Sequence, residues 1–213
     1  RLIRGSLGAL RRQGWRAFVG AAHACLLPCA AAAEDWGLFD ETFAAAVEVL
    51  DETELIDVDS NGIQANSSCS GGWISPDGRY VAFGGEATNL VPGDSNGKVD
   101  IFVRDRQTGQ TVRVSVGTGD VEGDGDSGTS SISADGRYVS FESWATNLVS
   151  GDTNGVPDIF LHDRQTGQTT RISVDSSGMQ ANDASGDPSI SADGRYIAFP
   201  SVASNLVSGD SNA

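Results

Sequence analysis

Two short segments of the chain carry side chains that could bind a cation. Each places Asp, Asn and Asp at the first, third and seventh positions of a loop, with a glycine directly after the Asn. The six residues are Asp94, Asn96 and Asp100 in the first segment and Asp152, Asn154 and Asp158 in the second. Ca²⁺ takes about six to eight oxygen ligands of this kind in proteins. The spacing therefore makes these loops candidate calcium sites, with the weak affinity of extracellular modules.

A second interpretation of the same residues needs no metal. Asp and Asn side chains accept hydrogen bonds from backbone amides two residues further on, which produces an Asx-turn. Both segments also depart from a full calcium loop, because the fifth position has no acid and the twelfth has no Glu. A complete ligand shell would need water or a further acid, and Asp105 and Asp163 are the nearest candidates. From the sequence, both interpretations stay open.

These loops belong to an internal repeat with a period of 58 residues. Its most regular part is Ser-Pro/Ala-Asp-Gly-Arg-Tyr, which occurs at 75–80, 133–138 and 191–196. Segment 58–66 matches segment 174–182, two periods later, so the phase extends upstream. A fixed period indicates an array of equal supersecondary units, and residues 53–213 hold about 2.8 copies of this one.

Each copy predicts four short strands joined by tight turns. In the middle copy, alternation of side chains indicates strands, at 130–133, 137–142, 158–163 and 169–174. Gly136 can close the first hairpin because glycine tolerates positive φ. Four antiparallel strands at a fixed period describe a β-propeller blade. We therefore expect an all-β fold, a partial propeller over 53–213 with three repeats, the last one truncated. A β-solenoid is a weaker alternative, because hairpins within each copy require antiparallel strands.

The repeat resembles a known family. The segments Ser-Pro-Asp-Gly-Arg-Tyr-Val-Ala-Phe (75–83) and Asp-Ile-Phe-Val-Arg-Asp-Arg-Gln-Thr-Gly (100–109) look like the WD-repeat-like β-propeller repeats of TolB-like periplasmic proteins. The resemblance covers about three quarters of the chain, and it implies that the Ser-Pro-Asp-Gly turn is structural. The period of 58 exceeds the usual value of about 40–45, and the inserted Asp/Asn loop accounts for the excess. Similar insertions are familiar in exported bacterial propellers.

The first 33 residues differ in character from the remainder. They contain five Arg and no acid, then an apolar run from Phe18, and they end in the small residues of 31–33. This is the layout of a secretory signal peptide. The apolar run of about 16 residues is short for a transmembrane helix, which needs about 20. We predict a signal peptide over 1–33 and a periplasmic or secreted protein that is not inserted in the membrane after cleavage. Residues 34–52 predict a linker or capping helix with one apolar face.

The charge of the chain limits its classes of partner, and its cysteines limit the disulfides that it can form. The chain has a formal net charge of −15, and residues 34–213 hold all 29 acids but only 9 of the 14 basic residues. Such acidity disfavours nucleic acid and anionic membrane surfaces, because both repel it. Cys69 is the only cysteine after residue 33, so no internal disulfide is predicted there.

No catalytic residue is predicted. His162 is the only histidine after residue 33, and it holds the strand position of Arg104 one copy earlier, which predicts an exposed side chain. The acids recur identically from copy to copy, whereas catalytic centres usually break repeat symmetry. Trp73 and Trp144 lie at different phases of the repeat, which predicts packing or rim residues rather than a repeated ligand platform.

Two functions remain open from the sequence. The first is a non-enzymatic exported propeller that binds a protein or polysaccharide, with calcium as a candidate ligand of its loops. The alternative is an accessory propeller of a prolyl-oligopeptidase-like serine hydrolase, or of a glycosidase, whose catalytic part is missing from this chain. A propeller closes with about four to eight blades, so we expect the chain to be part of a longer protein.

Overall fold

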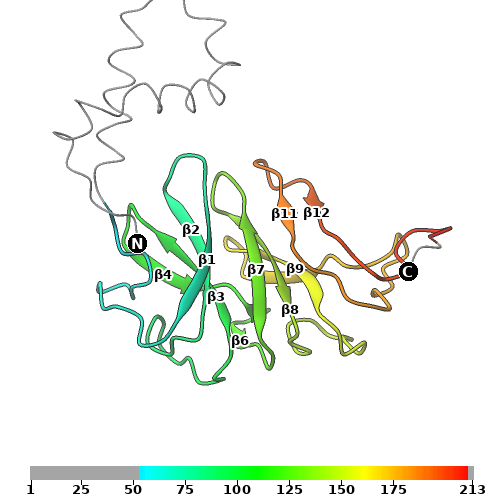
Figure 1. Cartoon of the computed structure of the whole chain (residues 1–213), viewed down its shortest axis with the longest axis horizontal. Helices are drawn as coiled ribbons and strands as arrows, with labels where there is room; N and C mark the ends of the chain where they lie inside the picture. Colours follow the sequence, from blue (N-terminus) through cyan, green and yellow to red (C-terminus); the bar gives the residue numbers. More distant parts are fainter. Residues whose placement is uncertain (1–52, 211–213) are drawn as a thin grey trace, which may run out of the picture. The chain divides into compact units, whose positions relative to one another are not determined.

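The computed structural model describes residues 53–210, and their regular structure is entirely β (Figure 1). The predicted signal peptide and the predicted helix at 34–52 lie outside these residues. None of the described segments forms a helix long and apolar enough to cross a membrane.

Two four-stranded antiparallel sheets follow one another along the chain, and each is ordered as a meander. The strands of the first sheet are β1 (Cys69–Ile74), β2 (Tyr80–Gly85), β3 (Asp100–Asp105) and β4 (Gln110–Arg113). Those of the second are β7 (Ser127–Ile132), β8 (Tyr138–Ser143), β9 (Asp158–Asp163) and β10 (Gln168–Arg171). The third repeat contributes β11 (Ser189–Ile190) and β12 (Ile197–Ala198). The prediction of repeated propeller blades is confirmed by this order.

A small hairpin separates successive blades. The one between the two sheets consists of β5 (Val116–Gly117) and β6 (Val121–Glu122), and single bridges form the corresponding hairpins at 58–64 and 174–180. The first two hairpins bond to the outer strand of the blade that follows. Thr111 Oγ1 donates to Val58 O, and Thr169 Oγ1 donates to Val116 O. An otherwise open strand edge is thereby covered.

The observed strands of the middle copy differ from the predicted ones by three residues at two ends and by one residue at four others. The first strand of the middle copy begins at Ser127 rather than at 130, because the register shifts between Ser127 and Ser130 and the strand resumes beyond the irregularity. The fourth strand ends at Arg171, because the chain then turns into the next hairpin. Gly136 has the positive φ expected of it, 68°.

The Ser-x-Asp-Gly-Arg turn is held by its own side chains. Ser133 Oγ donates to Asp135 Oδ1, and the backbone amide of Arg137 donates to the same oxygen. Arg137 then reaches the end of β9, where its Nε and Nη2 lie 2.8 and 2.7 Å from the two oxygens of Asp163. Arg79 and Asp105 form the same bidentate pair in the first blade. The repeated motif therefore joins two turns at one end of each blade.

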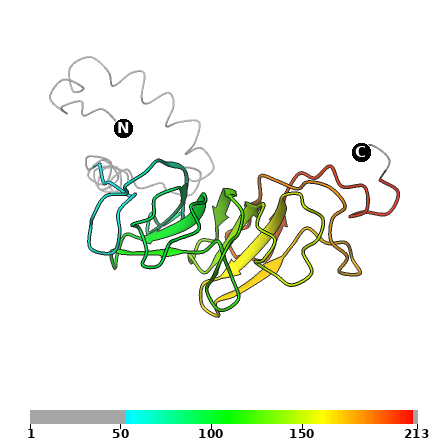
Figure 2. The same cartoon turned by 90° about the horizontal axis from the view of Figure 1, so that it is seen from below.

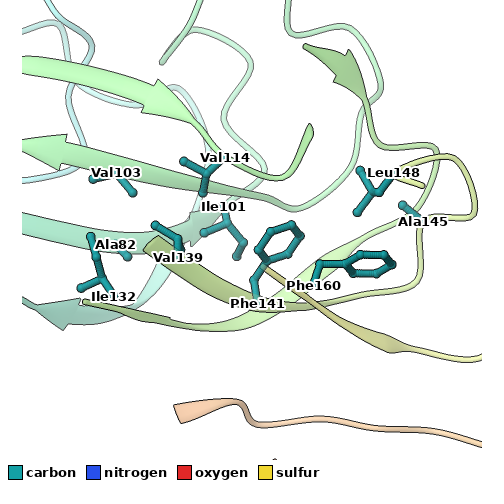
Figure 3. Close-up of a cluster of buried hydrophobic side chains, with 10 residues drawn as sticks. All are labelled: Ala82, Ile101, Val103, Val114, Ile132, Val139, Phe141, Ala145, Leu148 and Phe160. Carbon is teal, nitrogen blue, oxygen red and sulfur yellow. The ribbon is translucent and has the colours of Figure 1, made fainter. Parts of the chain in front are cut away.

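The main hydrophobic core lies between the two complete blades (Figure 3). The first blade contributes Ala82, Ile101, Val103 and Val114, and the second contributes Ile132, Val139, Phe141, Ala145, Leu148 and Phe160. The rings of Phe141 and Phe160 stack with centroids 5.9 Å apart. At the turn end, the Tyr80 ring lies directly over Gly136 of the next blade, where any Cβ would approach within 2.2 Å. Each blade is thus shaped to receive its neighbour.

Candidate functional site

Both candidate cation loops connect the second and third strands of a blade. In the first loop, Gly97 turns the backbone at a φ of 64°, and Asn96 Oδ1 accepts a hydrogen bond from the amide of Lys98 at 3.0 Å. Asn96 Nδ2 donates to Asp100 Oδ2 at 3.0 Å and to Gly123 O at 3.1 Å. The loop is therefore an Asx-turn that is tied to the hairpin after β4.

An arginine lies among the carboxylates of this loop. Arg113, the last residue of β4, places Nη1 3.1 Å from Asp100 Oδ2, 3.4 Å from Asp94 Oδ1 and 2.7 Å from Glu122 Oε1. The other oxygen of Asp100 accepts a hydrogen bond from Ser115 Oγ at 2.5 Å. The side chains of Asp94 and Asp100 are buried, and buried carboxylates need such a partner because an unpaired buried charge is costly.

The second loop repeats this arrangement with one acid fewer. Arg171 Nη1 lies 3.3 Å from Asp152 Oδ1 and 3.4 Å from Asp158 Oδ2, and Asn154 Nδ2 donates to Asp158 Oδ2 at 3.0 Å. Gln180 replaces the glutamate and accepts from Arg171 at 2.8 Å. The cluster of the first repeat thus holds three carboxylates around one guanidinium, and that of the second repeat holds two.

The acids within each cluster differ in electrostatic environment. Burial raises the pKa of Asp94, and the neighbouring carboxylate raises it further; the same two causes raise the pKa of Asp152. Glu122 lies at the edge of the cluster, where hydrogen bonds from the amide and the hydroxyl of Ser95 lower its pKa to about 2. Glu122 therefore stays ionised beside Arg113 at neutral pH.

The structure brings the six predicted residues together in two clusters of three. Among residues 53–210, no group of three or more His, Cys, Asp or Glu side chains has the arrangement of a metal site. Sequence reasoning missed six members of the clusters, and these are Arg113, Ser115, Glu122, Arg171, Ser173 and Gln180. The Arg pair and the Ser pair are each separated by 58 residues, so the repeat itself was the signal that could have found them. Calcium binding stays a prediction.

A Thr-Asn or Ser-Asn pair in each inserted loop clasps the neighbouring hairpin through hydrogen bonds. Thr146 donates to Asp124 from its amide at 2.6 Å and from its hydroxyl at 2.7 Å. Asn147 accepts from the amide of Asp124 and donates to Glu122 O at 2.7 Å. The same clasp joins Asn66 to Thr88 and Asn89, and Asn182 to Ser204 and Asn205. The loops are consequently fixed against the hairpins.

His162 is buried, which corrects the prediction of an exposed side chain. Its Nδ1 lies 2.9 Å from Thr169 Oγ1, and that hydroxyl uses its single proton to donate to Val116 O. Nδ1 must therefore carry a proton and donate. Burial lowers the pKa of His162. Arg104, at the same position of the first blade, is buried too and donates to Thr111 Oγ1. The prediction failed because the hairpin covers this strand position, and strand alternation does not reveal that cover.

The hairpins expose an apolar side chain at one fixed position. Ile63, Val121 and Met179 occupy equivalent places after the hairpin turns, and their side chains are 59%, 50% and 64% exposed. In the first hairpin, Asp59 Oδ1 accepts from the amides of Asn61 and Ile63, so backbone groups close the turn. We refer to Ile63, Val121 and Met179 as the apolar rim.

Charge is distributed unequally over the described residues, some of whose charged side chains are buried. The turn end of the blades holds five Arg and five Asp and is balanced; these are Arg79, Arg106, Arg137, Arg164, Arg195, Asp77, Asp105, Asp135, Asp163 and Asp193. The other described residues hold 17 acids but only Arg104, Arg113, Arg171 and Lys98 as basic side chains. The acid excess therefore lies on the loops and hairpins. Trp73 and Trp144 are about half exposed, as predicted for rim residues.

Searches with protein-family models and against curated proteins found no match. Similar solved structures include TolB from Acinetobacter baumannii, at 25% identity and a TM-score of 0.36, and the β-propeller domain of the Trilobed protease from Pyrococcus furiosus, at 14% and 0.39. A third is the acylaminoacyl peptidase from Pyrococcus horikoshii, at 17% and 0.37. The alignments cover 63%, 62% and 62% of this chain, but only 26%, 34% and 17% of those proteins.

The chain therefore spans about a third or less of these solved structures. The fold assignment rests on the strand order, the antiparallel register and the repeated turn described above. Together with the repeated motif at 75–83, these features identify residues 53–210 as blades of a β-propeller.

Proposed function

We propose that this protein is an exported, non-enzymatic binding scaffold, and that its hairpins and loops recognise a basic protein segment with apolar side chains. The observation that carries the proposal is the apolar rim. Exposed apolar residues scattered singly need no explanation, but here the same exposed position is apolar in all three described hairpins. The residue type differs each time, as Ile, Val and Met, so the feature in common is the apolar surface rather than a packing contact.

Charge supports a cationic partner. The acid excess lies on the same loops and hairpins as the apolar rim, and a surface of one sign attracts a partner of the opposite sign. The exposed acids of this surface include Glu86, Asp120, Asp124, Asp126 and Asp183. Apolar contacts would then add affinity, while the carboxylates would speed association and select basic partners.

Synthetic peptides test this proposal. The probe is a twelve-residue peptide of Lys and Leu, compared with a Lys and Ser peptide and with a Glu and Leu peptide of equal length. Binding to the chain is measured by isothermal titration at low and at high salt. We expect the Lys and Leu peptide to bind most tightly and to weaken at least about tenfold in 0.5 M salt, because exposed charges are screened there. Equal binding of all three peptides would contradict the proposal.

A triple variant isolates the apolar rim. Ile63→Ser, Val121→Ser and Met179→Ser together remove its apolar surface without touching the carboxylates. We expect about a fivefold or greater loss of affinity for the Lys and Leu peptide, and little change for the Lys and Ser peptide. The matched control changes exposed polar residues of two hairpins, Thr118→Ala and Ser176→Ala, and should bind as the native chain does. If the triple variant binds the Lys and Leu peptide normally, the rim has no binding role. Titration with a neutral glucan tests the polysaccharide alternative directly.

We retain calcium binding at the two acidic clusters as a hypothesis, and the position of Arg113 provides its test. A calcium ion that uses Asp94 and Asp100 must displace the guanidinium or bind beside it. Arg113→Gln removes that competitor, so calcium titration of this variant should give binding at least about tenfold tighter than that of the native chain. Arg171→Gln is the matched variant of the second cluster. No heat in the native chain or in either variant at millimolar calcium would reject the hypothesis.

A further inference from the structure

The middle repeat carries an exposed tryptophan beside a glutamate. Trp144 directly follows β8, and its side chain is 49% exposed. Glu142 lies two residues earlier, on β8 itself, and is half-buried. At the positions of the glutamate and the tryptophan, the first repeat has Gly84 and Glu86, and the third has Pro200 and Val202. Among the described repeats the pair occurs once, so the packing of a blade does not require it.

Two glycines give this pair its space. Gly128 on β7 adjoins both side chains, because a Cβ there would lie 3.5 Å from Trp144 Cζ3 and 3.7 Å from the carboxyl carbon of Glu142. Gly186 of the third repeat adjoins the glutamate as well, and a Cβ there would lie 2.9 Å from Glu142 Oε2. Gly186 precedes β11, which lies next to β7 (Figure 1), and Figure 2 shows the same blades from below. The pair therefore lies where the second and third repeats meet.

Groups of both repeats hold the glutamate in place. Thr129 Oγ1 donates to Glu142 Oε2 at 3.3 Å, and the amide of Asp187 donates to the same oxygen at 3.3 Å. Because both hydrogen bonds use Oε2, Oε1 can accept a hydrogen bond from a ligand. A carboxylate that is held in this way loses little freedom when a ligand binds.

The surroundings of the indole are acidic. The amide of Trp144 donates to the backbone carbonyl of Asp126 at 2.9 Å, and both Asp126 and Asp187 are exposed. The ion pairs found among residues 53–210 use none of the acids Asp126, Glu142 and Asp187. Three acidic residues that form no ion pair in the described part of the chain therefore border one exposed aromatic ring.

An aromatic ring that is bordered by carboxylates favours a cation over a neutral ligand. The face of an indole attracts a cation through its quadrupole, and Trp does so more strongly than Tyr or Phe. A planar guanidinium can stack on the ring and donate at the same time to a carboxylate beside it, and it is more weakly hydrated than an ammonium ion. A neutral sugar could stack on the ring, but it would gain nothing from the negative charge.

We propose that Trp144 and Glu142 form a subsite for an arginine side chain of the basic partner. The guanidinium stacks on the indole of Trp144 and donates to Glu142 Oε1, while Asp126 and Asp187 attract it from further away. This inference rests on the proposed function, because it names one side chain through which that partner binds. The subsite belongs to the same surface as the apolar rim, since Asp126 lies shortly after β6, the strand that carries Val121.

Single amino-acid derivatives test the subsite separately from the apolar rim. The probe is Nα-acetyl-arginine methylamide, and its neutral isostere Nα-acetyl-citrulline methylamide is the control. Binding to the full chain, labelled with ¹⁵N, is followed by NMR at the indole N–H of Trp144 and at the amide of Asp187. We expect saturable shifts with a dissociation constant below about 20 mM for the arginine derivative, and at least about fivefold weaker binding of the citrulline derivative. Equal binding of the two derivatives, no saturable shift, or tighter binding of methyl glucoside would overturn the proposal.

Three protein variants locate the bound arginine. Trp144→Ala removes the ring, and Glu142→Gln removes the charge with little change of shape, so each should weaken binding at least about threefold, as measured at the amide of Asp187. Trp73→Ala removes a similarly exposed indole from β1 and should leave binding unchanged. The amide spectrum of each variant checks that it folds. If Trp144→Ala fails to fold, Glu142→Gln and the two derivatives on the native chain still decide the matter. Unchanged binding in a folded Trp144→Ala chain would refute the assignment.

The result is independent of the peptide titrations. Arginine binding at Trp144 without any preference for the Lys and Leu peptide would reject the basic-segment scaffold and keep the subsite. Preference for that peptide without a response of Trp144 to the arginine derivative would keep the scaffold and reject the subsite.

Discussion

His162 has a buried imidazole that donates from Nδ1 to Thr169 Oγ1. Burial is the main cause of its lowered pKa, and the nearby Arg164 lowers it further, while Asp120 and Asp163 act in the opposite direction. The unfolded chain therefore binds a proton near pH 6.5 that the folded chain resists. The free energy of unfolding should consequently fall as the pH drops below about 6.5.

Urea unfolding at pH 7.5 and at pH 5 checks this expectation. Asp105 and Asp163 stay ionised in the folded chain over this interval, because Arg79 and Arg137 hold their pKa values low. Asp94 and Asp152 have raised pKa values, so the His162→Asn variant, rather than the pH interval alone, separates the histidine from the acids. In His162→Asn, the loss of stability between the two pH values should shrink. An unchanged pH dependence in the variant would assign the effect to other groups.

At the scale of elements, the blades fill the same position between their first and second strands with different pairs of residues. Ser127 and Ser143 face each other in the second blade, with Oγ atoms 3.0 Å apart, and Ser185 and Ser201 repeat the pair at 2.9 Å. The first blade has Cys69 and Gly85 at these positions, where a Cβ on the glycine would lie 2.6 Å from Sγ. The larger sulfur therefore takes the space that the second side chain occupies elsewhere.

A double-mutant cycle tests this exchange. Gly85→Ser alone should destabilise the chain by about 1–3 kcal/mol, because it overpacks a buried site. Cys69→Ser combined with Gly85→Ser should recover much of this loss by recreating the serine pair of the other blades. Chemical denaturation of the native chain, both single variants and the double variant gives the coupling free energy. Additive effects would mean that the two positions do not share one space.

The contact of the Tyr80 ring with Gly136 links one blade to the next. Its contribution to the free energy of unfolding can be measured by comparing alanine substitutions at two glycines. Gly136 and Gly155 both have a φ of 68°, but only Gly136 has a ring above it. Gly155→Ala should cost about 1 kcal/mol from backbone strain alone. Gly136→Ala should cost about 2–4 kcal/mol, because it adds a clash with Tyr80. Equal losses in the two melts would show that the inter-blade contact contributes little.

Most of the features that could be predicted from the sequence follow from patterns within a few neighbouring residues. The four strands, the turn with Gly136 and the Asx-turn at Asn96 all follow from alternation and turn chemistry within a few residues. The burial of His162 and the partners of Asp100 could not be predicted in this way. Both depend on a neighbouring hairpin or strand, so they are set by packing between elements rather than by local sequence. Arg113 stands at the end of β4, and the pairing of that strand places it beside the loop.

At the scale of the whole molecule, the chain joins a basic, apolar beginning to a strongly acidic remainder. We propose that this is an export signal and that the mature chain is periplasmic or secreted. Expression behind an initiator methionine in a Gram-negative host should yield a product that begins at Glu34, as measured by intact mass in the periplasmic fraction. Leu26→Arg with Leu27→Arg breaks the apolar run and should hold the uncleaved chain in the cytoplasm. An uncleaved product in the native case would refute the signal peptide.

The cover of each blade by the hairpin before it has a consequence for recombination. The hairpin at 58–64 bonds to the outer strand of the first blade, and β5–β6 bonds to that of the second. A gene fragment cut at the edges of a sheet would therefore deliver a blade with a bare outer edge. The unit that can be duplicated or transplanted intact begins with the hairpin, at about residue 55 or 113, and ends with the fourth strand. Duplication of a unit with these bounds yields a new blade whose outer strand is already covered by its own hairpin.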